Sequence, residues 1–146
     1  MINDASSRCA IIHRLLQDKP KYSIPDNTLP DNGLYFFYEE GETNGHDGSP
    51  RIVRVGNHPR SQNNLVNRLK QHYRHNKNGS VFRKYLGGAL MRRLDPNNPC
   101  LRPAPGKGHW EKQDTKACPE CKPFEMEVTR LLLKKFRFCC VKIDSQ

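Results

Sequence analysis

The chain has 146 residues, a mean hydropathy of -0.86, and 25 lysines and arginines against 15 acidic residues, which gives a formal net charge of +10. No apolar run approaches the ~20 residues that a membrane-spanning helix needs, so we expect no membrane partner. The positive charge favours a polyanionic partner, because basic side chains neutralise phosphates and release their counterions. We therefore expect a small basic protein that binds nucleic acid.

The cysteine content and the N-terminal segment bear on the cellular compartment. The segment MINDASSRCAIIHRLL has no basic stretch that leads into an apolar core, and it has no small-residue cleavage site. It does not look like a secretory signal, so we expect a cytoplasmic location. The six cysteines are then expected to be thiols or metal ligands rather than disulfides.

The first part of the chain predicts a helix followed by a hairpin. Residues 4–17 predict a short helix, after which a proline-rich loop leads into an aromatic run. The face of this helix that we expect to be buried carries Cys9, Ile12, Leu15 and Leu16. Residues 33–38 (GLYFFY) and 51–55 (RIVRV) both predict strands. Because their connection is too short for a crossover helix, we expect an antiparallel pair.

The second part of the chain predicts three helices and a strand. Residues 62–73 predict a helix on which Arg68 and His72 lie one turn apart in a polar stripe. Ser80 is the expected cap of the next helix, SVFRKYLGGALMRR, and PFEMEVTRLLLKK predicts the third. The final run, FRFCCVKI, predicts a strand. The expected buried face of the second helix carries Val81, Phe82, Tyr85, Leu86, Ala89 and Leu90.

Three motifs occur in order along this framework. They are GLY at 33–35, RVG at 54–56, and RLKQH at 68–72, and together they resemble the GIY-YIG nuclease family. More narrowly, RIVRVGNH, NRLKQH and GSVFRKYLGGAL are similar to a subgroup of small bacterial and phage-type members. The resemblance runs from about residue 29 to residue 143.

The resemblance implies an α/β (α+β) fold with a three-stranded antiparallel sheet flanked by helices. The element order predicted from the residues agrees with this fold. We expect one domain over residues 1–146, since this length suits a single core. Its expected parts are an N-terminal helix and loop (1–32), a catalytic core (33–94), an irregular proline-rich insertion (95–122) and a helix with the final strand (123–146).

The resemblance also implies a chemistry, the hydrolysis of phosphodiester bonds with one divalent metal ion, Mg²⁺ or Mn²⁺. Matched by position, Tyr35 would help to activate the attacking water, Arg68 would stabilise the charge on the phosphoryl group, and Glu125 would bind the metal. A guanidinium offers forked donors to phosphate oxygens, and one carboxylate can be enough to hold Mg²⁺. Glu127 is the competing acid near the start of the same helix.

The sequence departs from the family at the second tripeptide, where Arg54 stands at the position of a tyrosine. Arg54 would place positive charge beside Tyr35 or bind phosphate. His72 would contact phosphate or relay a proton, and a surface histidine near the helix end is the alternative. If Arg54 is not tolerated at this position, the chain would be a degenerate module that does not cleave.

Four basic residues after the arginine of the helix are expected to contact nucleic acid, namely Arg74, Lys77, Arg83 and Lys84. We therefore predict a metal-dependent endonuclease that acts on DNA. Two alternatives stay open. One is a non-catalytic nucleic-acid-binding module, with or without stabilising zinc, and the other is a nuclease that acts on RNA.

The pair Cys118 and Cys121 forms a CxxC motif of the kind that binds structural Zn²⁺. A tetrahedral zinc site needs four thiolate or imidazole ligands, and the motif supplies two. The alternative is a pair of reduced thiols without metal. Candidate further ligands are Cys100, His109, Cys139 and Cys140.

Overall fold

The computed structural model describes residues 5–58, 64–101, 103–104, 107–108, 110 and 119–143. They fall into two compact units: Met1–Asn67 with Lys135–Gln146, and Arg68–Lys134. The expected catalytic core, 33–94, therefore includes parts of both units, and the single-domain organisation stays a prediction. Within the described residues, no helix is long and apolar enough to cross a membrane.

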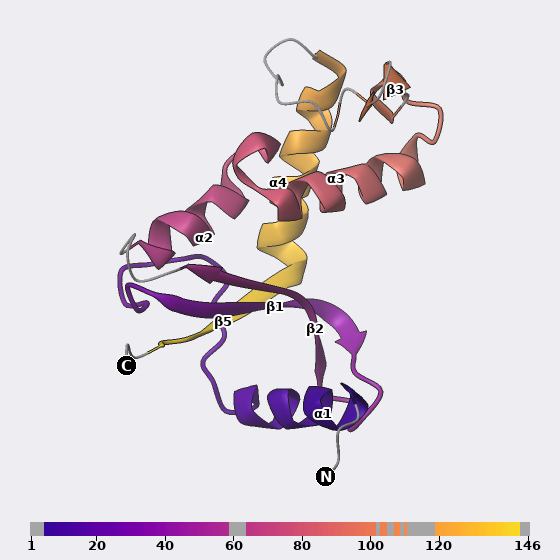
Figure 1. Cartoon of the computed structure of the whole chain (residues 1–146). Coiled ribbons are helices and arrows are strands. Elements are labelled where there is room, and N and C mark those ends of the chain that lie inside the picture. The colour runs from indigo at the N-terminus through magenta and orange to yellow at the C-terminus, as the bar shows by residue number, and fades with distance from the viewer. Residues whose placement is uncertain are drawn as a thin grey trace. The chain divides into compact units, whose positions relative to one another are not determined.

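The first unit contains a three-stranded antiparallel sheet in the order β2-β1-β5 (Figure 1). Its strands are β1 (Gly33–Thr43), β2 (Pro50–His58) and β5 (Phe136–Val141). The predicted fold class, a mixed α and β fold built on such a sheet, is confirmed. The first two strands are longer than predicted, because pairing continues through an irregularity after Phe37 and ends with the pair Thr43 and Pro50.

The hairpin turn between β1 and β2 is organised by the side chain of Asn44. Its Oδ1 accepts hydrogen bonds from the backbone N–H groups of His46 and Asp47, at 2.7 and 3.1 Å. Its Nδ2 donates to the hydroxyl of Ser49 at 2.6 Å and lies 3.3 Å from Nδ1 of His13. An asparagine that bonds the backbone two residues on is a recurrent way to make a turn without regular pairing.

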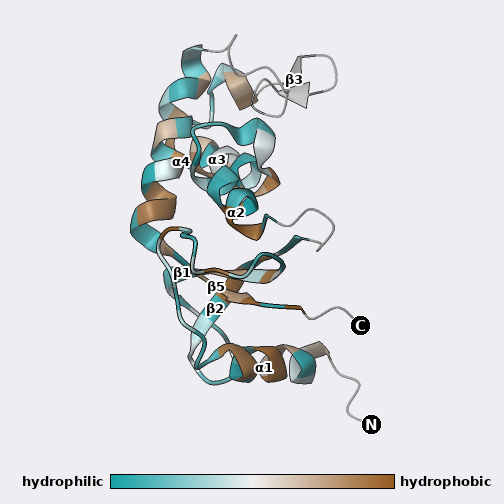
Figure 2. Cartoon of the chain, turned by 90° about the vertical axis from the view of Figure 1, so that its left-hand side faces the viewer, coloured by the Kyte–Doolittle hydropathy of each residue, from teal (hydrophilic) through white to brown (hydrophobic). Residues whose placement is uncertain are grey.

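Helix α1 (Ala5–Leu16) covers one face of this sheet within the first unit (Figure 1). Its buried residues are His13 and Leu16, and Leu16 packs into a cluster with Phe36, Tyr38 and Cys139. The predicted buried face was therefore wrong apart from Leu16, since Leu15 is 70% exposed. The hydrophobic residues of α1 are visible in Figure 2. The contact between Nδ1 of His13 and the side chain of Asn44 places His13 on the buried face of the helix, where the sequence had predicted apolar residues.

The remaining helices are α2 (Leu65–Tyr73), α3 (Val81–Leu94) and α4 (Lys122–Lys135). The predicted helices agree with them to within a few residues, although residues 62–63 lie outside the described part. The segment that we expected to be irregular contains only short elements where it is described. These are η3 (Pro99–Leu101), β3 (Pro103–Ala104), β4 (Lys107–Gly108) and η4 (Pro119–Cys121).

The buried face of helix α3 differs in part from the face predicted from its apolar residues. Val81 and Tyr85, both expected inside, are exposed. The residues that α3 buries are Phe82, Arg83, Gly87, Gly88 and Met91. The prediction was right at Phe82 and wrong at Val81 and Tyr85, because the charged side chain of Arg83 and two glycines take inner positions.

The two glycines make room for Trp110. A Cβ atom on Gly87 would lie 2.0 Å from Cζ2 of the indole, so only glycine fits at this position of the helix. The indole Nε1 donates a hydrogen bond of 2.8 Å to the carbonyl of Lys84. Trp110 also packs with Met91, Cys100 and Cys121. The ring thus fixes Trp110, near the middle of the irregular segment, against α3.

We expect Gly87→Ala to lower the free energy of unfolding by about 1–3 kcal/mol, because the added methyl group overpacks the indole. Gly88→Ala is the matched control: its Cβ atom would meet Nη1 of Arg92 at 3.4 Å and Trp110 at 3.7 Å, which are ordinary contacts. This change should be neutral or stabilising, since alanine favours a helix by about 1 kcal/mol over glycine. Urea unfolding, followed by the fluorescence of the single tryptophan, measures both. Equal stabilities of the two variants would contradict the account.

Candidate active site

Tyr35 lies in the middle strand of the sheet, directly across from Gly56 of β2. Its side chain is almost fully buried, and its ring covers the glycine: a Cβ atom on Gly56 would lie 2.1 Å from Cζ and 2.2 Å from the phenol oxygen. The edge of Phe37 supports the ring, with the ring centres 6.0 Å apart. The glycine of the second tripeptide is therefore required for the tyrosine of the first one.

Arg54 and His58 share a sheet face with Tyr35. Residues directly opposite each other in an antiparallel pair point to the same side, and the register pairs Gly33 with His58 and Phe37 with Arg54. Nε of Arg54 and Nε2 of His58 are both buried without a hydrogen-bond partner among the described residues. Buried polar atoms are normally hydrogen-bonded, so two such atoms on one face of the sheet are unusual.

Tyr38, the other tyrosine of this strand, belongs to the opposite face. It packs with Leu16 and Phe36, and its hydroxyl lies 3.5 Å from Sγ of Cys139. Burial, together with the nearby thiol, raises the pKa of Tyr38 well above its ordinary value. A tyrosine that is held protonated in this way is not suited to activate water.

Arg68 of α2 belongs to the second unit and is half-buried. Its Nη1 donates hydrogen bonds to Oε1 of Gln71 at 2.7 Å and to the carbonyl of Gly79 at 2.9 Å. These two bonds fix one edge of the guanidinium. Nη2 and Nε make no hydrogen bond within the described residues, so they can donate to an oxyanion as a fork.

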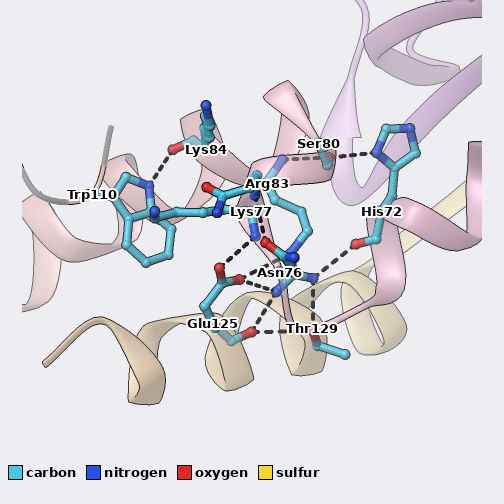
Figure 3. Close-up of polar contacts among 10 residues, drawn as sticks. His72, Asn76, Lys77, Ser80, Arg83, Lys84, Trp110, Glu125 and Thr129 are labelled. Atoms are coloured by element: carbon cyan, nitrogen blue, oxygen red, sulfur yellow. Dashed lines mark hydrogen bonds and ion pairs between the residues drawn. The ribbon is translucent and has the colours of Figure 1, made fainter. Parts of the chain in front are cut away.

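His72 is fully buried, which contradicts both the predicted polar stripe and the alternative of a surface histidine. Its Nδ1 and Oγ of Ser80 lie 2.7 Å apart (Figure 3). Its ring also forms a T-shaped pair with the ring of Phe82, with the ring centres 5.8 Å apart. Oγ of Ser80 also accepts a hydrogen bond from the N–H of Arg83 and so caps α3, as predicted for Ser80. His72 therefore helps to hold the start of α3.

Glu125 forms a buried ion pair with Arg83 (Figure 3). Its Oε2 accepts from Nη2 of Arg83 at 2.7 Å, and its Oε1 accepts from the backbone N–H of Lys77 at 2.6 Å. The side chains of Arg83 and Glu125 are 0% and 4% exposed. Arg83 also donates to the carbonyl of His72 at 2.9 Å and to Oγ1 of Thr129 at 2.8 Å. The pair thus joins α2, α3 and α4.

A divalent metal ion does not fit at Glu125. Both carboxylate oxygens accept hydrogen bonds, and Arg83 already neutralises the charge inside the unit. The competing acid, Glu127, is engaged by Arg130 at 2.6 Å. Within the described residues, no three or more histidine, cysteine, aspartate or glutamate side chains are grouped so as to hold a metal ion. The contacts around Glu125 therefore do not fit the metal ion that the resemblance implies.

The four basic residues expected at the nucleic-acid surface divide into two pairs. Arg74 is exposed and Lys84 is half-buried. Lys77 and Arg83 are fully buried, which contradicts their expected surface role. Arg83 neutralises Glu125, and Nζ of Lys77 lies 5.2 Å from the ring centre of Trp110.

Of the cysteines proposed as zinc ligands, Cys118 and the partner candidate His109 lie outside the described residues. Cys121 is buried beside Cys100. Cys139 and Cys140 are residues of β5 in the first unit. Burial raises the pKa of Cys140 to about 12, which disfavours the thiolate form that binds metal.

Sequence reasoning missed the Arg83–Glu125 pair, and it gave little weight to His58, whose buried Nε2 lies on the same sheet face as Arg54. No local pattern signals the pair, because its members are 42 residues apart. A signal for His58 does exist: it lies four residues after Arg54 in a strand, and side chains of even spacing share a face.

Comparisons with known proteins give one match. The family model for the GIY-YIG domain matches residues 10–146, which is nearly the whole chain and contains Tyr35, Arg54, Arg68 and Glu125. Neither the curated proteins nor the solved structures gave a match.

We expect Glu125→Ala to cost about 3–5 kcal/mol of stability, because it leaves the Arg83 guanidinium buried without its counter-charge. Glu127→Ala, two residues along the same helix, should change stability little, since it loses an exposed ion pair. Replacing both buried charges, as in Arg83→Met with Glu125→Leu, should restore part of the loss. Urea unfolding of the three variants tests this. Wild-type stability in Glu125→Ala would show that the carboxylate is not a structural group.

Proposed function

The chain belongs to the GIY-YIG family, and we propose that it is an endonuclease that hydrolyses phosphodiester bonds in DNA. The members of this family are in general endonucleases that act on nucleic acids. One observation in this chain carries the proposal beyond the family. Arg54 and His58 present buried nitrogens without partners on the sheet face that also holds Tyr35.

A phosphodiester group supplies what these nitrogens lack. Its non-bridging oxygens carry negative charge and accept hydrogen bonds from a guanidinium and from an imidazole N–H. A buried polar atom without a partner costs free energy, so binding of the phosphate would recover that cost. The arginine at the tyrosine position of the second tripeptide would then serve as a phosphate ligand.

Tyr35 would help to orient and activate the attacking water. A phenol needs nearby positive charge to act as a base, and Arg54 on the same face supports this role for Tyr35. Arg68 would stabilise the negative charge that develops on the phosphoryl group, through the edge of the guanidinium that Gln71 and Gly79 leave available. His72 would act indirectly, by holding the start of α3.

Mg²⁺ or Mn²⁺ is the cofactor that the family resemblance implies. When bound beside a phosphodiester, such an ion adds positive charge without a proton transfer. Since Glu125 does not fit as its ligand, we assign steps only to Tyr35, Arg54 and Arg68 and propose no metal ligand.

A second candidate function, a nucleic-acid-binding module that does not cleave, is favoured by one observation. The second tripeptide lacks the family's tyrosine and has Arg54 in its place. Such a module would bind phosphate through the same residues. A nuclease that acts on RNA would use the same residues, because the contacts proposed here are made to the phosphodiester group that DNA and RNA share.

We expect Arg68→Ala to lower the rate of DNA cleavage by about 10²–10³-fold, the usual effect of removing a preorganised group that stabilises transition-state charge. Lys70→Ala removes the same charge from the same helix at an exposed position and should leave the rate unchanged. Tyr35→Phe should lose at least about 10²-fold, whereas Tyr38→Phe on the opposite face should not. Initial rates on a labelled duplex, with circular dichroism to verify folding, measure this. Equal rates in Arg68→Ala and Lys70→Ala would sink the assignment.

Arg74→Ala should weaken DNA binding and lower the slope of log affinity against log salt by about 0.9, because one phosphate contact is lost. Arg130→Ala is the control, since its charge is already paired with Glu127 at 2.6 Å. Fluorescence anisotropy between low and moderate salt gives both slopes. The surface role of Arg74 would be refuted by an unchanged slope.

A further inference from the structure

The solvent-exposed face of helix α3, in the second unit, carries two large hydrophobic residues and a cation in line. Tyr85 is 73% exposed and Val81 is 47% exposed. They lie one helical turn apart, and the exposed residues Ala89 and Arg92 continue the same stripe toward the end of the helix. A single apolar side chain at the surface is ordinary, but an exposed aromatic ring aligned with further apolar residues forms a patch. We call these four residues the Tyr85 face.

The charges on α3 are all positive. The helix has no aspartate or glutamate, and Arg83 is its only basic residue with an ion pair among the described residues, formed with Glu125 in the interior. The side chain of Lys84 points away from that pair (Figure 3). Arg92 and Arg93 are in the last turn and so suit the helix dipole, but Lys84 is in the first turn, where positive charge is unfavourable. The dipole alone therefore does not explain the positive charge around the exposed ring.

We propose that the Tyr85 face binds a single strand of DNA, with a base stacked on the ring of Tyr85 and phosphates beside Lys84 and Arg92. The inference rests on the proposed function, in which DNA is the substrate. Every base has a flat face that stacks on an aromatic ring, and a strand with unpaired bases leaves that face uncovered. In a duplex the neighbouring base pairs cover it. Cations beside the ring would bind the phosphates that accompany each base.

The geometry of Arg92 brings its charge close to the ring. A Cβ atom on Gly88 would lie 3.4 Å from Nη1 of Arg92, so the guanidinium reaches back along the helix to the turn of Gly88. Tyr85 precedes Gly88 by three residues, which is about 4.5 Å along the helix axis. The short side chain of Ala89 leaves the space beside the ring open. A base and a neighbouring phosphate of one strand can therefore contact the ring and the guanidinium together.

The Tyr85 face begins beside Arg68. Nη1 of Arg68 donates a hydrogen bond of 2.9 Å to the carbonyl of Gly79, and Val81 follows two residues later as the first residue of α3. From Val81 to Arg92 the helix rises about 16 Å, which is long enough to contact several nucleotides. A strand whose phosphodiester group is held by Arg68 can then continue along the helix. The face would thus hold DNA next to the bond that is cut.

Fluorescence anisotropy of a labelled oligothymidylate tests the proposal, with chelator present so that binding is measured without cleavage. We expect Tyr85→Ala to weaken binding of the single strand at least about fivefold, the lower end of what one stacked base contributes. Tyr85→Phe keeps the ring and should bind as the wild type does. Both variants should bind a duplex of equal length with wild-type affinity. Because Tyr85 is exposed, both should fold normally, which circular dichroism verifies.

The cation is tested by the salt dependence of the same binding. Arg92→Ala should lower the slope of log affinity against log salt for the single strand by about 0.7, since one phosphate contact is lost. Lys134→Ala is the matched control, because Lys134 is an exposed cation in the last turn of α4. Equal slopes in the two variants would contradict the placement of a phosphate beside Arg92.

Several results at Tyr85 would overturn the proposal. They are a wild-type chain that does not bind the single strand, unchanged binding in Tyr85→Ala, and equal losses in Tyr85→Ala and Tyr85→Phe, which would identify a contact of the hydroxyl. Equal losses on the single strand and the duplex would also overturn it. A chain that binds the single strand through Tyr85 but cuts no DNA would refute the endonuclease and leave the Tyr85 face supported.

Discussion

Arg83 and Glu125 meet at 2.7 Å with almost no exposed surface, and hydrogen bonds from the neighbouring segments surround them. Removing two ions from water costs several kcal/mol per ion, so the pair is tolerable only where every donor and acceptor is matched. That requirement fixes the positions of the groups around it. The carbonyl of His72, the N–H of Lys77 and the hydroxyl of Thr129 must all lie where the pair needs them.

The Arg83–Glu125 pair also affects the position of Arg68, through a short series of hydrogen bonds. The guanidinium of Arg68 is anchored on the carbonyl of Gly79, and Gly79 ends the 3-10 helix that starts at Lys77. Lys77 is held by Glu125, and Ser80 is held by His72. A buried charge pair thus sets the orientation of the arginine that we assign to the transition state. In the first unit a different constraint acts. The Tyr35 ring occupies the space that any side chain at position 56 would fill, so this position must be a glycine.

Sequence patterns predicted the elements well where local physics decides them. The aromatic run of β1, the alternating run of β2 and the capped helix after Ser80 all form as expected. The patterns failed where contacts with residues far away in the sequence decide which side chains are buried. The buried face of α3 is set by Arg83 and by the glycines under Trp110, and its apolar residues Val81 and Tyr85 face solvent.

For the candidate site, too, the sequence predicted the local elements but not the contacts between distant residues. The antiparallel pairing of the two tripeptide strands followed from the sequence, but their register did not: Gly56, and not Arg54, lies directly across from Tyr35. The metal role of Glu125 did not follow from the local sequence, because an acid at the start of a helix looks the same whether it binds a metal or an arginine. Only the position of Arg83, 42 residues away, distinguishes the two.

The central claim is that this member of the GIY-YIG family cleaves within nucleic acid strands. It is tested most directly by incubating the purified wild-type chain with a covalently closed supercoiled DNA circle, which has no ends. Parallel samples contain labelled single-stranded DNA and RNA, each with Mg²⁺ or Mn²⁺ and with chelator. The account predicts nicked or linear circles that accumulate with time in the presence of metal. Intact circles in every metal, despite measurable binding of the DNA, would contradict it and would identify a binding module.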